Sequence, residues 1–183
     1  MIHTSPLGNV EIPETLLTPF VLRHADRLGD APALIDGPSG RRIAYRDLAS
    51  SVQTLAGGLL ARGFARGDVL AIMAPNLPEY AVAFHGTAWA GGTVTTINPT
   101  YTAGEVRHQL KDSGAKILVA ARAVADVATE AALGTGVAEV VWIEAGGATA
   151  LTDLMGAPLA AQAPVEPTSV VALPYSSGTT GLS

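Results

Sequence analysis

Short apolar segments that alternate with helical patterns constrain the fold of this chain more than any other feature of its sequence. The apolar segments are predicted to be strands, at residues 69–73, 93–97, 117–120, 137–143 and 169–173. These segments lack the regular apolar–polar alternation of a half-exposed strand, so they suit a sheet that is covered on both faces. Helices between such strands imply right-handed crossovers and parallel strands. The sequence therefore predicts an α/β fold with three layers, in which helices flank a mostly parallel sheet.

Helix signals fill the sequence between these strands. The clearest helix is predicted at residues 46–62, where apolar residues recur at helical spacing and Gly63 follows at the place typical of a C-terminal glycine. The recurring residues are Leu48, Val52, Leu55 and Leu59. Two later helices are predicted to begin with a capping box, in which two side chains satisfy free backbone N–H groups. One box pairs Asn76 with Glu79, and the other pairs Thr102 with Glu105.

The N-terminal region predicts a helix, a β-hairpin and the long helix described above. Thr18 can cap the first helix, and Pro19 suits its first position. The turn sequence at residues 37–40, Gly-Pro-Ser-Gly, separates the two short strands of the hairpin. Arg41 and Arg42 begin the second of these strands and are expected to be solvated.

Two parts of the chain are expected to differ in organisation. Residues 1–64, with the first helix, the hairpin and the long helix, are expected to pack on the main sheet. Residues 65–183 are expected to form an α/β subdomain that ends in a ligand-binding loop.

The composition excludes several classes of function. Hydrophobic residues make up 48% of the chain, charged residues 15%, and the formal net charge is −5, a balance typical of a globular protein. Because Lys and Arg form no cluster, neither nucleic acid nor an anionic membrane is an expected partner. The chain has no Cys, and its histidines lack metal-ligand spacing, so no metal site is expected. No secretory signal or membrane-spanning apolar run is visible, and we expect a cytoplasmic protein.

The sequence PYSSGTTGLS at residues 174–183 follows the last predicted strand and carries the clearest chemical signal. A loop at the carboxyl end of a parallel strand lies where open α/β sheets bind ligands. Its backbone N–H groups can form a concave anion site, and its glycines allow a close approach. A polyphosphate would suit it, and the candidate residues are Ser176, Ser177, Gly178, Thr179, Thr180 and Gly181. By composition alone, a small surface turn is an equally good interpretation.

Other nucleotide motifs do not occur in this sequence. A Walker A loop requires a Gly–Lys pair, which the chain does not contain. No strand is followed by the G-x-G-x-x-G pattern, so a nicotinamide-dependent oxidoreductase lacks its fingerprint.

The segment LPYSSGTTGLS resembles the signature loop of the adenylate-forming enzymes. Further segments resemble the same family: ALID with YRDL, NLPEY, AGGT and INPTYT. The resemblance covers the whole chain and is nearest to the 4-coumarate–CoA ligase branch of the AMP-forming acyl-CoA synthetases. It implies that the chain corresponds to part of the large N-terminal domain of the adenylate-forming fold.

The resemblance also implies an activity. Such a ligase activates a carboxylate, for example 4-coumarate or a similar aromatic or fatty acid, with ATP and Mg²⁺ to give an acyl-adenylate and pyrophosphate. Coenzyme A then displaces AMP. The loop hydroxyls would contact the β- and γ-phosphates, and the two glycines would let the backbone close on them. Fatty-acid and benzoate ligases, luciferase-like enzymes and peptide-synthetase adenylation domains are related alternatives, and a non-catalytic binding or interaction module is an alternative of another class.

The family pattern continues beyond the last residue of this sequence. The loop lysine would stand directly after Ser183, and the magnesium carboxylate, most of the acyl pocket and the catalytic lysine of a C-terminal domain would follow later. We therefore expect no catalytic residue within this chain and no turnover by the chain alone. Apolar surface that the family buries against a second sheet would be exposed, so we also expect self-association.

Overall fold

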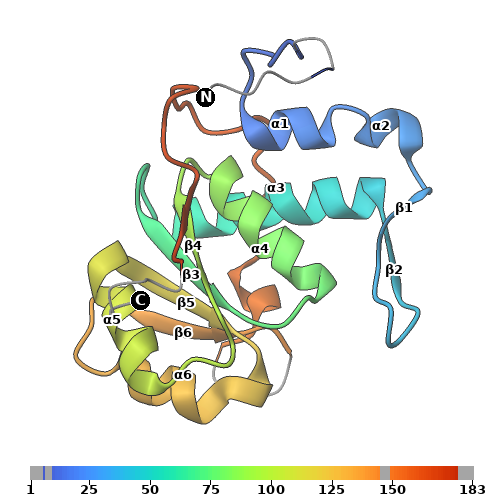
Figure 1. Cartoon of the computed structure of the whole chain (residues 1–183). Coiled ribbons are helices and arrows are strands. Elements are labelled where there is room, and N and C mark those ends of the chain that lie inside the picture. Colours follow the sequence, from blue (N-terminus) through green and yellow to red (C-terminus); the bar gives the residue numbers. More distant parts are fainter. Residues whose placement is uncertain (1–5, 7–9, 145–148, 177–183) are drawn as a thin grey trace.

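The computed structural model describes residues 6, 10–144 and 149–176, and its centre is a parallel sheet between two layers of helices (Figure 1). The strands of this sheet are β3 (Val69–Met73), β4 (Thr93–Ile97), β5 (Ala115–Ala120), β6 (Glu139–Trp142) and β7 (Ala172–Pro174). Their order is β6-β5-β3-β4-β7, and every neighbouring pair is parallel. The predicted three-layer, mostly parallel α/β fold is confirmed.

Helices cover both faces of the sheet. α3 (Tyr45–Ala61) and α4 (Pro78–Trp89) lie on one face, whereas α5 (Ala103–Ser113) and α6 (Ala125–Ala132) lie on the other (Figure 1). Alternate residues of β3 enter the two cores: Leu70 and Ile72 pack with α3 and α4, and Ala71 and Met73 pack with α5 and α6. Every residue of β3 is buried, which explains its continuous apolar sequence.

The N-terminal region contains the predicted hairpin, but its first helix is broken. β1 (Pro32–Ile35) and β2 (Arg42–Ala44) form the antiparallel hairpin. α1 (Leu17–Leu22) and α2 (Ala25–Leu28) replace the single helix. The prediction that Thr18 caps the first helix is wrong, because the helix begins earlier and Thr18 lies buried within it. Its hydroxyl is instead 3.0 Å from Nδ1 of His85 and so joins α1 to α4.

One of the two predicted capping boxes is present. The backbone N–H of Glu105 donates to Thr102 Oγ1, and the backbone N–H of Thr102 donates to Glu105 Oε2 at 2.7 Å. Helix α5 therefore starts as predicted. The box at Asn76 is wrong: the N-cap residue of α4 is Leu77, and no side chain caps it. Because Pro78 opens the helix, Glu79 is its second residue rather than its third, and the carboxylate of Glu79 binds an arginine instead.

The return from β6 to β7 passes over α3 and α4. Two short 3₁₀ helices, η1 (Arg122–Val124) and η2 (Leu151–Leu154), flank the β6 region. After η2 the chain is held on α3 by backbone bonds from Gly156 N to Thr54 O at 2.9 Å and from Leu159 N to Gln53 O at 3.0 Å. The Trp89 indole of α4 donates to Leu159 O at 2.8 Å. After this crossing the chain forms β7, which lies at the opposite end of the strand order from β6.

Two glycines of α3 make this close crossing possible. A Cβ atom on Gly57 would stand 1.8 Å from Ala157 O, and one on Gly58 would stand 1.6 Å from Leu154 O. Backbone atoms cannot yield as a flexible side chain can, so any side chain at these positions pushes the crossing segment away.

None of the helices in the described part of the chain is both long enough and apolar enough to cross a bilayer.

The substitution Gly58→Ala tests this packing. Overpacking of this kind should lower the free energy of unfolding by about 1–3 kcal/mol or more, although alanine favours the helix. Gly104→Ala in α5 is the control, since its Cβ would meet only Thr102 Oγ1 at 4.0 Å. That variant should gain about 0.5–1 kcal/mol from helix propensity. Urea unfolding followed by circular dichroism measures both, and equal stabilities of the two variants would contradict the assignment.

Candidate functional site

The carboxyl ends of β3, β4 and β7 meet at one edge of the sheet and enclose a hollow. The hollow measures about 430 Å³. Its lining comes from the ends of three strands and from α4: Ala74, Asn76, Tyr80, Thr96, Ile97, Asn98, Pro99, Tyr101 and Tyr175. The chain leaves β3 toward α4 on one face and leaves β4 toward α5 on the other, so the two loops diverge. Such a divergence in an open parallel sheet is the usual place of a ligand crevice.

Two phenols in the wall of the hollow are protonated at neutral pH. Burial raises the pKa of Tyr80, although a hydrogen bond with Thr96 opposes this effect. Burial, together with a hydrogen bond to Asp112 and the charge of that carboxylate, raises the pKa of Tyr175 to about 12. The Tyr175 hydroxyl donates to Asp112 Oδ2 at the end of α5. These phenols are therefore hydrogen-bonding groups and not bases.

Hydrogen bonds within the loop after β4 define its shape. Asn98 Oδ1 accepts hydrogen bonds from Thr100 N at 3.0 Å and from Thr100 Oγ1 at 2.9 Å. This Asx-type turn leads directly into the capping box of α5. Asn98 therefore shapes this loop, which forms one wall of the hollow.

Of the six predicted phosphate-binding residues, the structure describes Ser176. It is exposed and follows Tyr175, directly after the end of β7 at Pro174. Ser177, Gly178, Thr179, Thr180 and Gly181 lie outside the described residues. A strand therefore leads to the predicted loop and ends beside the hollow, whereas the contacts of the loop residues stay a prediction.

Hydroxyl and amide side chains hold β7 in place, and the sequence patterns did not indicate them. Thr93 Oγ1 donates to Val170 O at 2.8 Å, and Thr95 Oγ1 donates to Leu173 O at 3.0 Å. Gln109 of α5 donates to Thr95 Oγ1 at 2.8 Å. The available signal was the threonine content of β4, because Thr93 and Thr95 are buried and buried hydroxyls need partners.

Comparison with known proteins decides the family. The model of the family described as AMP-binding enzyme matches residues 21–183. The chain belongs to this family. It is 36% identical over 186 residues to 4-coumarate–CoA ligase 3 of Oryza sativa subsp. japonica. The aligned region covers 100% of this chain and 33% of that protein. For 4-coumarate–CoA ligase 1 of Petroselinum crispum the identity is 34%, with 100% and 34% covered.

Solved structures agree with the fold of the AMP-binding enzymes. A long-chain-fatty-acid–CoA ligase from Archaeoglobus fulgidus superposes with a TM-score of 0.87 and 22% identity, over 97% of this chain and 37% of that one. The chain spans about a third of the length of the curated relatives it matches.

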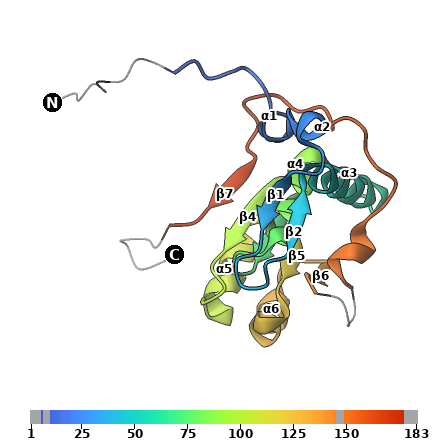
Figure 2. The same cartoon turned by 90° about the vertical axis from the view of Figure 1, so that its right-hand side faces the viewer.

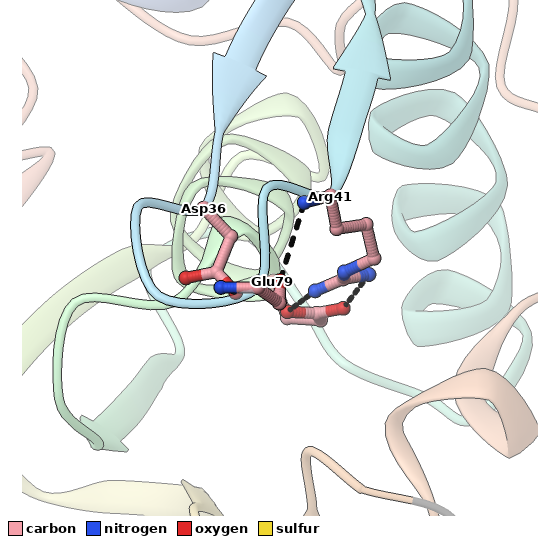
Figure 3. Close-up of polar contacts among 4 residues, drawn as sticks. Asp36, Arg41 and Glu79 are labelled. Atoms are coloured by element: carbon pink, nitrogen blue, oxygen red, sulfur yellow. Dashed lines mark hydrogen bonds and ion pairs between the residues drawn. The ribbon is translucent and has the colours of Figure 1, made fainter.

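Within the described residues of this chain, no three His, Cys, Asp or Glu side chains gather into a metal site. An ion pair joins the hairpin to the start of α4 (Figure 3). Arg41 contacts both carboxylate oxygens of Glu79, at 2.6 Å and 2.8 Å. Arg41 is exposed, as expected, and this two-point contact in addition orients its guanidinium.

A second hollow, of about 690 Å³, lies between the hairpin and α4. Asn76 and Tyr80 line both hollows, so the hairpin lies close to the carboxyl edge of the sheet. In the hairpin turn, the Asp36 backbone N–H donates to Arg41 O at 2.8 Å, and the Asp36 carboxylate accepts from the Ser39 N–H at 3.3 Å. The hydrogen bond from Arg41 lowers the pKa of Glu79, although burial opposes the change.

Substitution of Glu79 should change how stability depends on pH. Because the pKa of Glu79 in the folded chain lies below its ordinary value of 4.5, the contribution is complete above that pH and disappears as the pH falls through the lowered pKa. Glu79→Gln should cost about 0.2–1 kcal/mol at pH 7 and weaken the loss of stability in acid.

The control for this prediction is Glu130→Gln, which removes the same charge from a looser pair. Its carboxylate lies 4.0 Å from Arg107. Urea titrations between pH 3 and 7 measure both variants. Identical pH profiles for Glu79→Gln and the unsubstituted chain would refute the role of the ion pair.

Proposed function

We propose that this chain is the N-terminal portion of an AMP-forming acid–thiol ligase whose loop after β7 binds the phosphates of ATP. The observation that carries the proposal is the position of Tyr175 and Ser176, which leave the sheet at its carboxyl edge beside the hollow. The location of the crevice, the membership of the AMP-binding enzyme family and the hydroxyl-rich sequence support it together.

The loop would supply hydrogen-bond donors to negative charge. The hydroxyls of Ser176, Ser177, Thr179 and Thr180 would contact the β- and γ-phosphates, and Gly178 and Gly181 would allow the backbone to approach closely. An anionic carboxylate attacks the α-phosphate slowly unless fixed donors and a cation offset the repulsion between the two anions. In this proposal Mg²⁺ is carried by the phosphates of the nucleotide.

The substrate we propose is 4-coumarate or a similar aromatic or fatty acid, with coenzyme A as the acyl acceptor. The names of the curated relatives, which are 4-coumarate–CoA ligases, support the aromatic choice. The acyl pocket and the later catalytic groups would come from the part of the relatives that this chain does not span.

The chain should bind MgATP weakly, because one loop provides only part of a nucleotide site. Isothermal calorimetry should give a Kd above about 1 μM, that is, a binding free energy weaker than about −8 kcal/mol. The double variant Ser177→Ala with Thr179→Ala should weaken binding at least about tenfold, since each lost bond to a charged group is worth about 1.5–3 kcal/mol. Ser169→Ala, an exposed hydroxyl before β7, is the control. Submicromolar binding would contradict the view of a partial site, and an unchanged affinity in the double variant would remove the loop from it.

The chain alone should not turn over. With ATP, Mg²⁺, coenzyme A and 4-coumarate, a coupled assay should detect no pyrophosphate release above the protein-free background. A chain extended by the region that the relatives possess should release pyrophosphate only when an acid is present. Full turnover by the 183-residue chain would refute the incomplete-site proposal, and an inactive extended chain would favour a non-catalytic binding module.

The chain should also self-associate through an apolar groove of about 290 Å³, which lies near the amino ends of β4 and β7. Ile12, Leu17, Phe20 and Val170 line this groove and are exposed. Such patches promote association. Light scattering at rising concentration should show dimers or larger species, and Phe20→Asp should reduce them. Leu133→Asp, an exposed leucine elsewhere, is the control. A monomer at every concentration would contradict this prediction.

A further inference from the structure

The strand that leads to the predicted phosphate loop is held weakly by its own ladder. β7 has three residues and pairs with β4 at the edge of the described sheet (Figure 2). One of these residues is Pro174, which has no backbone N–H to donate. A loop that must hold phosphates needs a fixed starting point, so other contacts have to set the position of β7.

A buried relay from α5 provides the first of these contacts. Gln109 is 2% exposed and donates from Nε2 to both Thr95 Oγ1 at 2.8 Å and Thr96 O at 2.9 Å. Because Thr95 Oγ1 accepts from Gln109, its own proton is free to point at Leu173 O, 3.0 Å away. The direction of each bond is thereby fixed, and α5 reaches through β4 to the backbone of β7.

The second contact joins the last turn of α5 to the root of the loop. Asp112 precedes the last residue of α5 and accepts from the Tyr175 hydroxyl. A negative charge near a helix C-terminus opposes the helix dipole, so this aspartate does not stabilise its own helix. Its contact with Tyr175 gives it a different role.

We propose that Gln109 and Asp112 are positioning residues, which hold β7 and the root of the loop at Tyr175 and Ser176 beside the hollow. The ligand of the loop rests on the proposed function, whereas the anchoring of β7 does not. In this arrangement α5 determines where the loop starts, and the loop residues determine what is bound.

The experiment compares Asp112→Ala, Asp112→Asn, Tyr175→Phe and the double variant Asp112→Ala with Tyr175→Phe. Lys111→Ala, an exposed neighbour on α5, is the control. Three properties are measured: urea unfolding, hydrogen exchange of the peptide covering residues 171–176, and MgATP affinity.

Asp112→Ala should leave global stability unchanged or slightly raised, while exchange in residues 171–176 rises at least about threefold and MgATP affinity falls. Tyr175→Phe should have the same effect, and the double variant should add nothing further. Asp112→Asn should retain most of the protection, because its side-chain oxygen still accepts the phenol proton. A merely structural role would instead lower global stability and affect exchange across the whole sheet.

Gln109→Met tests the buried relay, since it preserves the volume and removes both donors. It should raise exchange in residues 171–176 more than in β3. Unchanged exchange in Asp112→Ala and Tyr175→Phe would overturn the proposal for that anchor, and unchanged exchange in Gln109→Met would overturn it for the relay. If the unsubstituted chain binds no MgATP while exchange responds as expected, the phosphate function fails and the anchoring of β7 stands.

Discussion

The burial of β3 and its neighbours on both faces is the constraint on which the rest of the structure depends. All five residues of β3 are buried, and alternate side chains enter opposite cores. Parallel pairing with β4 and β5 requires each connection to cross over a face, so helices must cover both sides. The same geometry gathers the carboxyl ends of the strands at one edge, where the hollow and the predicted loop lie.

The position of the candidate site also depends on backbone contact far from it. β7 reaches the edge beside β4 because the crossing segment lies directly on Gly57 and Gly58 of α3. Once there, the short strand is held by hydroxyl and amide groups from β4 and α5 as well as by its ladder. An apolar sheet thus uses a few buried polar groups, each with a partner, to fix a strand that its own backbone secures poorly.

The sequence predicted the architecture well because its signals are local. Apolar runs separated by helical patterns predicted the strands, the Thr102–Glu105 pair predicted the start of α5, and Gly63 followed the end of α3. For the site, the sequence predicted a loop directly after a strand, and Ser176 follows β7 at the carboxyl edge of the sheet. The turn at Asn98 is equally local, since its hydrogen bond spans two residues.

Only the tertiary structure decided the strand order and the long-range partners of the side chains. Asn76 and Glu79 have the spacing of a capping box, yet Glu79 binds Arg41 of the hairpin, 38 positions earlier. Thr18 carries a capping side chain, but it is buried against His85. The sequence by itself determined periodicity, turns and the capping box of α5, which arise between neighbouring residues. It could not determine which distant groups meet, because that follows from how the helices and strands pack together.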